Sequence, residues 1–463
     1  MMVRVFGHYV SRAYLMLGVA EFLASILALW YGAHLRFAGP LPELEEGSYP
    51  LWYTAVLYAV LLIASMVSVG MYQRGLRPSG GLLVRIGLSF LFASMAMSLV
   101  FYAVPGLFVG RGVIAYAMLI SLLSILLLRN FFYHAASEDI RKHRVLVVGS
   151  GKHAQQILDR EAESDTFAVV ACVQLHDGED TVPKVLCIQP KGTLLDSAVE
   201  HDADELVIAV DDRRRRLPVH ELLDCKMAGI AVLDLPSFFE KEAACIRIDM
   251  LTPGWLLTSS GFRVRGLGQY GKRLFDLTGA LLGIVLTAPL MLVTTMAILW
   301  ESGWRGPVFY HQTRVGMNGN PFRLHKFRSM RTDAEADGVA RWAQANDDRV
   351  TPVGRFIRKT RLDELPQLFN VLRGEMSLVG PRPERPEFVN QFNHKIPFYN
   401  ERHRVRPGVT GWAQLSYQYG SSEDDAREKL QYDLYYVKNT SFFLDLIILL
   451  ETVEVVLWGK GAR

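Results

Sequence analysis

The stretch KRLFDLTGALLGIVLTAPLMLVTTMAILWE, Lys272 to Glu301, decides how this chain is laid out. Its apolar run exceeds the roughly 20 residues that a helix needs to cross a hydrocarbon core about 30 Å thick. A simple crossing would put all later residues on the far side of the membrane. Basic residues nevertheless flank both ends, which favours both ends on the same, cytoplasmic side. They are Arg263, Arg265, Lys272 and Arg273 before the stretch, and Arg305, Arg314, Arg323 and Lys326 after it.

Pro289 interrupts this stretch near its middle. Proline has no amide hydrogen to donate and its ring clashes with the preceding turn, so a sharp kink is expected there. We therefore predict a re-entrant membrane helix over residues 272–301 that enters from the cytoplasm, bends and returns. Polar Thr287 should help to satisfy the carbonyls that the kink frees. An ordinary kinked span is the alternative.

The first part of the chain has the pattern of a membrane module. Residues 1–138 contain four apolar segments close to spanning length, which predict a bundle of four transmembrane helices. Basic residues at both ends of the module place both ends in the cytoplasm. Glu21, inside the first segment, either marks an intramembrane functional site or is protonated or paired in a structural role. The segments run from about Tyr14 to Leu35, Trp52 to Met71, Leu82 to Phe101 and Val113 to Tyr133.

Residues 139–262 have the pattern of a Rossmann-like α/β domain. The run HRVLVVGSGKHAQQIL, His143 to Leu158, is an apolar strand, a glycine turn and an amphipathic helix. Gly149, Gly151 and Ala154 match GxGxxA, whose amides at a helix N-terminus can bind a diphosphate. The domain either binds a nucleotide there or is structural, dimerising or regulatory. No tyrosine in the chain has a lysine four residues later, which disfavours a nucleotide-sugar dehydratase or epimerase.

Composition narrows the classes of function. The formal net charge is only +3, so the overall charge does not indicate nucleic-acid binding. The hydrophobic share of 50% and the mean hydropathy of +0.16 fit a membrane protein. The cysteines form no CxxC pair, which indicates reduced thiols on a cytosolic face and neither a zinc site nor a disulfide framework. They are Cys172, Cys187, Cys225 and Cys245.

The stretch TRLDELPQLFN, Thr360 to Asn370, carries two adjacent carboxylates, Asp363 and Glu364. If Thr360 capped a helix with Asp363 at its third position, the acids would be structural. Pro366 would then fall beyond the first turn, where proline is poorly tolerated. We therefore predict a helix that starts at Asp363, with both carboxylates at its mouth. Adjacent carboxylates repel each other, and a hard divalent cation such as Mg²⁺ would hold both of them ionised.

Arginines are abundant around the sequences PRP, Pro381 to Pro383, and RPGVTGW, Arg406 to Trp412. Their planar guanidinium groups suit bidentate phosphate binding. A carboxylate beside Mg²⁺ and arginines can attack a phosphorus atom and form an aspartyl phosphate, because the cations stabilise charge on the transferred group. The residues themselves therefore favour phosphoryl-transfer chemistry at the acidic pair.

A series of motifs in the last part of the chain resembles the bacterial polyprenyl-phosphate sugar-1-phosphate transferases. These are the monotopic phosphoglycosyl transferases that start exopolysaccharide and O-antigen synthesis. The resemblance covers about Gln269 to the C-terminus, and the preceding segments are similar to those of the large form of the family. It implies a mostly α-helical catalytic domain over residues 263–463. The motifs are KRLFDL, the hairpin broken at Pro289, FYHQTRVG, FRLHKFRSM, VGRFIRKTRLDELPQLFNVL, EMSLVGPRPERP, RHRVRPGVTGWAQ and YDLYYVKN.

This resemblance implies a ping-pong reaction. Asp363 corresponds to the nucleophile that attacks the β-phosphate of a UDP-sugar, releases UMP and holds the sugar phosphate until undecaprenyl phosphate takes it. Glu364 corresponds to the second residue of the dyad, which with Asp363 would hold Mg²⁺. Many members have serine before the helix-breaking proline, where this chain has Ala288, so Thr287 or backbone packing would have to steady the kink. Candidates for phosphate or nucleotide contacts are Lys326, Arg328, Arg358, Arg361, Arg382 and Arg406.

The same resemblance implies a location in the bacterial inner membrane, with the catalytic domain on the cytoplasmic face. It implies an undecaprenyl-phosphate sugar-1-phosphate transferase for a hexose such as galactose or glucose, and a homodimer is expected. The last apolar stretch, Ser441 to Trp458, is expected to lie on the membrane interface, with a packed core helix as the alternative. A membrane-anchored nucleotide-sensing scaffold of polysaccharide assembly is the competing function.

Overall fold

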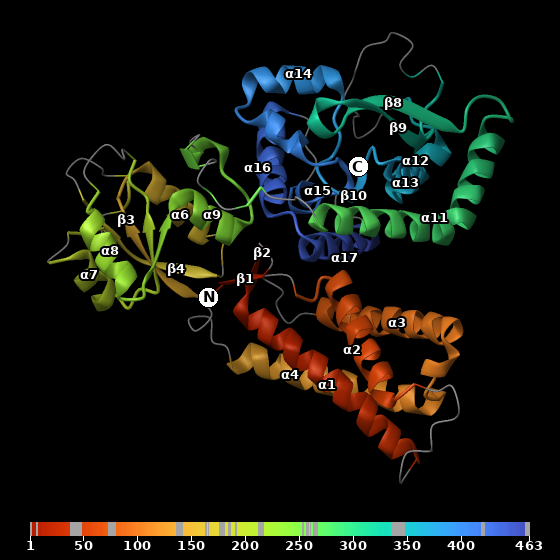
Figure 1. Cartoon of the computed structure of the whole chain (residues 1–463), viewed down its shortest axis with the longest axis horizontal. Coiled ribbons are helices and arrows are strands. Elements are labelled where there is room, and N and C mark those ends of the chain that lie inside the picture. Colours follow the sequence, from red (N-terminus) through yellow and green to blue (C-terminus); the bar gives the residue numbers. More distant parts are fainter. Residues whose placement is uncertain are drawn as a thin grey trace. The chain divides into compact units, whose positions relative to one another are not determined.

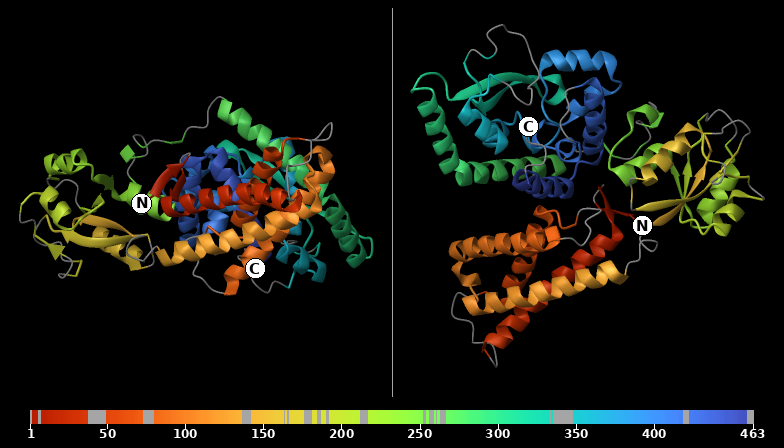
Figure 2. Two further views of the ribbon diagram at one scale, coloured as in Figure 1. Left: turned by 90° about the horizontal axis from the view of Figure 1, so that it is seen from below. Right: turned by 180° about the vertical axis from the view of Figure 1, so that it is seen from behind.

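The computed structural model describes most of the chain in two compact units, Met1–Val5 with Tyr9–Ala243 and Phe6–His8 with Ala244–Arg463 (Figures 1 and 2). Ala244 to Met250, which the sequence pattern placed with the α/β domain, pack in the second unit, where Ile246 and Ile248 join the core. The described residues are all except 1, 6–7, 38–48, 73–79, 136–141, 163, 165, 176–180, 184–186, 190–191, 212–216, 252–253, 256–258, 260, 263–266, 333, 335–347, 418–421 and 459–463.

Long apolar helices dominate the start of the chain. Two short strands, β1 (Met2–Val5) and β2 (His8–Ser11), come first. The four predicted apolar segments are confirmed as helices, and their crossing of a bilayer stays a prediction. Among the described residues, these four and Gly268–Glu301 are long and apolar enough to cross a membrane. The helices are α1 (Arg12–Phe37), α2 (Leu51–Ser68), α3 (Gly80–Ala103) and α4 (Arg111–Ala135), with the 3₁₀ turn η1 (Pro105–Leu107) before α4.

Helices α1 and α4 pack closely because a small residue lies between them. A Cβ atom on Gly32 would lie only 2.9 Å from the backbone nitrogen of Ala117. Farther along the same pair of helices, Arg129 Nε lies 2.7 Å from Glu21 Oε1, and both side chains are buried. The hydroxyl of Tyr72 also donates to Glu21. The structural reading of Glu21 is therefore confirmed, since a buried carboxylate needs such partners.

The α/β part of the first unit is a parallel sheet in the order β5-β4-β3-β6-β7. The chain runs outward from β3 first to one side and then to the other, which is the doubly wound arrangement. This confirms the predicted α/β alternation. The strands are β3 (His143–Val148), β4 (Phe167–Val173), β5 (Cys187–Ile188), β6 (Glu205–Ile208) and β7 (Ala231–Asp234), and the helices are α6 (Lys152–Ala162), α7 (Leu194–Glu200), α8 (Val219–Met227) and α9 (Leu235–Ala243).

The second unit is mostly helical, with two small sheets, a large apolar core and a smaller cluster of Ile298, Phe327 and Ile357. In the antiparallel sheet β8 pairs with β9, and in the parallel sheet β10 pairs with β11. Its helices are α11 (Leu267–Glu301), α12 (Pro352–Lys359), α13 (Gln367–Arg373), α14 (Pro386–Lys395), α15 (Trp412–Ser416), α16 (Glu423–Asn439) and α17 (Phe442–Trp458). Its strands and 3₁₀ turns are β8 (Phe309–Val315), β9 (Pro321–Phe327), β10 (Ser377–Val379), β11 (Gly408–Thr410), η2 (Ile248–Met250), η3 (Met317–Gly319), η4 (Leu362–Glu364) and η5 (Tyr399–Arg404).

Buried charges attach the first half of α11 to the rest of this unit. Asp276 accepts hydrogen bonds from the Ser377 hydroxyl (2.9 Å) and the Leu378 N–H (3.1 Å) of β10. Lys272 Nζ lies 3.1 Å from Asp276 Oδ1 and 2.8 Å from Asp445 Oδ2 of α17. Because ions buried in this way need close partners, α11 is held at a defined position on the domain.

Helix α11 runs unbroken from Leu267 to Glu301 and contains Pro289. Figure 1 shows it turning sharply part of the way along. Thr287 Oγ1 donates to the Gly283 carbonyl (2.7 Å), a back-bond that itself tends to bend helices. The bend agrees with the predicted kink. The Thr287 contact is to the Gly283 carbonyl and not to the Val285 carbonyl that Pro289 leaves without a donor, so the predicted steadying role of Thr287 stays a prediction. The return of the helix to the cytoplasmic side stays a prediction.

Helix α17 is both packed and apolar on its outer side. Leu444, Asp445 and Ile448 are completely buried, whereas Phe442 is 62% exposed. The packed-helix alternative therefore describes one face of α17. The opposite face remains available for the membrane interface.

Candidate active site

The two adjacent carboxylates lie on a short 3₁₀ turn, η4, between α12 and α13. The predicted helix start at Asp363 is wrong, because α13 begins only at Gln367, with Pro366 as its N-cap. The capping alternative is not observed either. Thr360 is the C-cap of α12, and its hydroxyl donates back to the Phe356 carbonyl (2.9 Å).

A left-handed residue creates this turn. Arg361 has φ 58° and ψ 13°, a conformation that costs a non-glycine residue roughly 1–2 kcal/mol. The backbone thereby leaves α12 abruptly and turns Asp363 and Glu364 inward, where they are only 7% and 8% exposed. Backbone strain of this kind is common at functional sites. No periodicity in the sequence signals it.

Three cationic side chains converge on one oxygen atom, Glu364 Oε1. Lys326 Nζ donates to it at 2.9 Å, and Arg382 Nη2 donates at 3.1 Å. Arg361 Nη1 lies 3.7 Å from the same atom. Lys326 Nζ also lies 4.0 Å from Asp363 Oδ2. The predicted cations Lys326, Arg361 and Arg382 are thus brought together at the dyad.

The two carboxylates differ in their electrostatic surroundings. Burial raises the pKa of Asp363, and the lowering effect of Lys326 does not outweigh it. Burial also acts to raise the pKa of Glu364, but Lys326 and Arg382 more than offset it, so that this pKa is lowered. Paired carboxylates with opposite shifts are suited to different roles. Glu364 is the ionised counter-charge of the cations, and Asp363 is the more basic carboxylate.

Other predicted basic residues lie farther from the dyad. Arg358 acts on Asp363 at longer range and lowers its pKa. Arg406 Nε donates to the Gly374 carbonyl at the end of α13 (3.0 Å). Arg328 extends toward Gly306, where an added Cβ atom would lie 2.5 Å from its Nη1 atom. Neither of these last two arginines touches the dyad in the part of the chain described, and phosphate binding by them stays a prediction.

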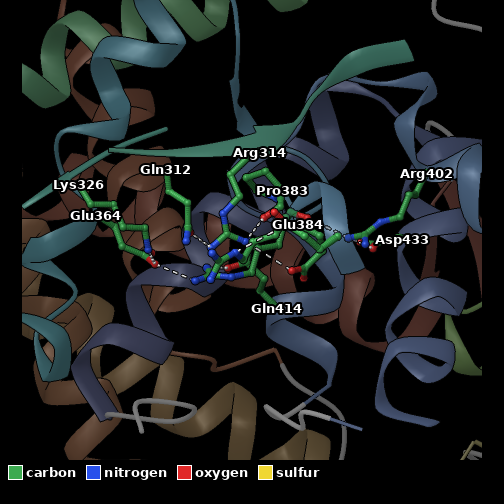
Figure 3. A network of polar contacts seen from close by, with 12 residues as sticks. Gln312, Arg314, Lys326, Glu364, Pro383, Glu384, Arg402, Gln414 and Asp433 are labelled. Atoms are coloured by element: carbon green, nitrogen blue, oxygen red, sulfur yellow. Dashed lines mark hydrogen bonds and ion pairs between the residues drawn. The ribbon is translucent and has the colours of Figure 1, made fainter. Parts of the chain in front are cut away.

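Buried polar contacts hold the PRP loop that carries Arg382 (Figure 3). Arg402 Nη2 donates to the Arg382 carbonyl (2.9 Å) and also lies 2.7 Å from Asp433 Oδ2. Arg314 Nη1 donates to the Pro383 carbonyl (3.0 Å). The backbone of the loop is therefore fixed at Arg382 and at the next residue, Pro383.

Gln414 acts directly on Arg382, since its Oε1 atom accepts from Arg382 Nη1 at 3.2 Å. The sequence pattern marked Arg402 only as one of several arginines suited to phosphate binding, and it gave Asp433 and Gln414 no role. They come from η5, α16 and α15, and no spacing between them could have shown that they meet. Only the arginine-rich composition around the loop was visible beforehand.

The acidic pair fits one kind of metal site. Mg²⁺ is usually bound through one or two carboxylates together with substrate phosphates and water. Asp363 and Glu364 provide two such carboxylates. No group of three or more His, Cys, Asp or Glu side chains that could hold a metal occurs among the residues the structure describes. A bound Mg²⁺ would therefore depend on substrate oxygens for its remaining ligands.

The glycine turn of the α/β domain is the second predicted phosphate site, and a carboxylate of the same chain lies on it. Asp211 accepts hydrogen bonds from the N–H groups of Lys152 and His153, both at 2.9 Å, at the start of α6. A Cβ atom on Gly151 would lie 2.3 Å from Asp211 Oδ2, so glycine is needed there to admit the carboxylate. The amides that would bind a diphosphate are used within the domain.

Two parts of the chain match known families. Residues 267–459 match the family described as bacterial sugar transferase. Residues 52–223 match a family described as CoA-binding domain. The first match contains the dyad and the cations around it. The second contains the glycine turn and begins within α2.

Individual relatives also match parts of the chain. A UDP-N-acetylgalactosamine-undecaprenyl-phosphate N-acetylgalactosaminephosphotransferase of Aeromonas hydrophila is 46% identical over 245 residues, 52% of this chain and 56% of that protein. A UDP-glucose:undecaprenyl-phosphate glucose-1-phosphate transferase of Klebsiella pneumoniae is 43% identical over 274 residues, 58% of each chain. A Caulobacter vibrioides protein of the same name is 44% identical over 193 residues, 41% of this chain and 71% of that protein. The matched part thus spans little more than half of the first two relatives.

Proposed function

The chain belongs to the bacterial sugar transferase family, and we propose on this basis that it transfers a sugar 1-phosphate from a UDP-sugar to undecaprenyl phosphate. The products would be UMP and an undecaprenyl-diphosphate sugar, formed at the start of exopolysaccharide or O-antigen synthesis. The three relatives above are all named for phosphotransfer to undecaprenyl phosphate. The proposal gives the same reaction class to this chain.

The observation that carries the proposal is the buried dyad with its unequal carboxylates. Glu364 Oε1 lies within 3.1 Å of two cationic groups, from Lys326 and Arg382, whereas Asp363 is only within 4.0 Å of Lys326. Asp363 is therefore the carboxylate that is less engaged and better able to attack. The cations around Glu364 would also face the diphosphate, where they stabilise developing charge.

The reaction has two steps. A carboxylate oxygen of Asp363 attacks the β-phosphorus of the UDP-sugar, and the bond between this phosphorus and the bridging oxygen breaks, so UMP leaves with that oxygen. A phosphate oxygen of undecaprenyl phosphate then attacks the same phosphorus, and the bond to Asp363 breaks. The enzyme carboxylate is regenerated. In both steps the attacking and leaving groups carry negative charge that nearby cations offset.

Mg²⁺ belongs to this proposal as a cofactor, with Asp363 and Glu364 as its protein ligands. When bound, it would neutralise charge on the diphosphate. Lys326, Arg361 and Arg382 have a separate task, since they keep Glu364 ionised and oriented. Removing divalent ions with EDTA should abolish UMP release, and adding Mg²⁺ should restore it.

The deciding experiment is UMP release by the purified protein with undecaprenyl phosphate, Mg²⁺ and a panel of UDP-sugars. Each substrate is tested alone, because the relatives named above divide between N-acetylgalactosamine and glucose. Release with one or two sugars, coupled to formation of the lipid-linked product, is expected. No release with any UDP-hexose or UDP-acetamidohexose would leave the nucleotide-sensing scaffold as the better account.

The cytoplasmic location of the catalytic unit and the re-entrant course of α11 also belong to the proposal. They are tested by labelling a cysteine just beyond α11 with a membrane-impermeant maleimide. Arg305 is exposed and suits this purpose better than Gly306, whose φ of 88° would strain a cysteine. With Arg305→Cys, labelling is expected only after the cytoplasmic face is opened. Labelling from the periplasm would instead mean that α11 crosses the membrane once.

A further inference from the structure

One buried carboxamide joins the helix that follows the dyad to the strand that carries Lys326. Asn370 lies in α13 and is 0% exposed. Its Oδ1 atom accepts from the His325 N–H (3.0 Å), and its Nδ2 atom donates to the Arg323 carbonyl (2.8 Å). Both backbone groups belong to β9, just before Lys326.

The side chain of Asn370 makes the hydrogen bonds that a neighbouring strand would otherwise make to β9. One residue of a parallel neighbour would likewise donate to the carbonyl of one residue and accept from the N–H two residues later. Strand β9 pairs with β8 through backbone contacts, and Asn370 binds groups that β8 does not use. The carboxamide therefore fixes where β9 lies along α13.

The orientation of this carboxamide is unambiguous. Its Nδ2 atom also donates to Glu375 Oε2 at 2.6 Å, so both of its hydrogens are used. A flipped amide would place Nδ2 against the His325 N–H, and its oxygen against the Arg323 carbonyl and a carboxylate. Such a flip would lose every one of these hydrogen bonds.

The geometry of β9 links the hydrogen bonds of Asn370 to the position of Lys326 at the dyad. Side chains alternate along a strand, so Leu324 and Lys326 lie on the same face of β9. Leu324 is 3% exposed and belongs to the core that includes Val371 of α13. Lys326 therefore extends on the side of β9 that faces α13, and its Nζ atom reaches Glu364.

A second link between β9 and α13 is weaker. Arg373 Nη1 lies 2.6 Å from His325 Nε2, but this contact is exposed to solvent. Exposed polar pairs contribute little to positioning, whereas a buried and fully bonded amide is costly to disturb. Asn370 is thus the stronger of the two links.

We propose that Asn370 is a positioning residue that holds β9 so that the Lys326 ammonium stays against the dyad. This inference rests on the proposed transferase activity and adds a residue to its machinery. Asn370 does not touch the reacting atoms. It acts only through the placement of Lys326, and that restriction gives a sharp test.

The test is a double-mutant cycle with Asn370→Ala, Lys326→Met and the double variant, measured as kcat and KM for UMP release. Asn370→Ala alone should lower kcat by about 10–100-fold, because a shift near 1 Å at a catalytic group has effects of this size. In the Lys326→Met background the same change should alter kcat by no more than about twofold. Multiplicative losses in the double variant would overturn the proposal.

Two further variants separate positioning from folding. Asn370→Asp keeps the acceptor for the His325 N–H but sets a second oxygen against the Arg323 carbonyl and Glu375 Oε2, so it should retain no more activity than alanine. Asn439→Ala is a matched control, because Asn439 is 4% exposed and donates to the Tyr435 carbonyl in α16 (3.2 Å). Its effect on kcat should be the same with and without Lys326, since its hydrogen bond lies within α16 and not on β9.

The proposed function and this inference fail in different ways. If the wild-type protein releases no UMP from any sugar, the transferase proposal fails, and the positioning claim is then tested by an experimental structure of Asn370→Ala. The claim stands if Lys326 Nζ has left Glu364 Oε1, from which it is 2.9 Å in the native chain. It is wrong if the Lys326 side chain is unmoved.

Discussion

The glycine turn of the α/β domain and the dyad of the catalytic unit both bring positive groups to one of the chain's own carboxylates. At the turn, Asp211 takes the N–H groups of Lys152 and His153. At the dyad, Lys326 and Arg382 face Glu364, and a second carboxylate is buried beside it. A carboxylate that satisfies backbone amides caps a helix. In the proposed reaction, the two buried carboxylates with unequal cation contacts serve as counter-charge and nucleophile.

Removing the nucleophile should have the largest effect and is the most direct way to break this comparison. Asp363→Asn is expected to lower UMP release by about 10⁴-fold or more, as loss of a nucleophile does in other enzymes. It should also abolish the trapped phosphosugar adduct seen by intact-protein mass spectrometry. Asp211→Asn serves as the control and should leave both signals in place. Near-native activity in Asp363→Asn would disprove the assignment.

Neutralising the counter-charge should have the next largest effect. Glu364→Gln leaves Lys326 and Arg382 without their ionised partner, and we expect kcat to fall by roughly 10²–10³-fold. The structural part of the loss is checked by the unfolding transition in detergent. If Glu364→Gln lost stability but kept its kcat, Glu364 would have only a structural role, as Asp211 has at the turn.

The excess of positive charge near the PRP loop predicts a pH effect at His403. Burial and the neighbouring Arg402 lower the pKa of His403 to about 3, below the value of about 6.5 in an unfolded chain. Its contribution to stability is therefore complete above pH 6.5 and is lost as the pH falls from there toward 3. At about pH 5 the loss is roughly 2 kcal/mol.

Replacing His403 by glutamine should remove this pH dependence. The free energy of unfolding is measured near pH 7.5 and near pH 5 for both proteins, by tryptophan fluorescence in guanidinium chloride. The difference between the two pH values should be smaller by about 2 kcal/mol in His403→Gln. An unchanged difference would mean that His403 is not held neutral in the folded protein.

The smallest effect is expected at the glycine turn. Asp211→Ala removes a helix cap and should lower stability by roughly 1 kcal/mol, while UMP release stays within about twofold of the wild type. The wild-type protein should show no thermal shift with coenzyme A, because the amides of the turn are taken. A clear shift in the wild type would show that Asp211 yields to a ligand, and that the two regions are more alike than their contacts indicate.

The local sequence pattern predicted the acidic pair but not the backbone conformation that presents it. The adjacent acids and Pro366 were visible in the sequence, and they placed a functional site at Asp363 and Glu364. The short turn that presents them depends on the left-handed Arg361, and α13 starts only at Gln367. Nothing in the spacing of apolar residues distinguishes such a turn from the start of a helix. The two acids are therefore buried side by side, but on a different element from the one predicted.

The predicted basic residues show the same limit. The family resemblance marked six cations as candidate phosphate contacts, and the structure brings Lys326, Arg361 and Arg382 to Glu364. Arg406 instead caps the end of α13. A motif shows that a cation is nearby in the chain, but only the packing of β9, α13 and the PRP loop decides which cations reach the dyad.

The sequence by itself determined the four apolar helices, the strand and helix alternation around the glycine turn, a bend within α11 and the presence of an acidic pair among cations. These features depend on periodicity and on near neighbours, which local physics controls. Only the tertiary structure decided that Asp211 lies on the turn, that Glu364 receives the cations and that Asn370 anchors the strand of Lys326. Those contacts join residues far apart in the chain, and their geometry exists only once the elements have packed.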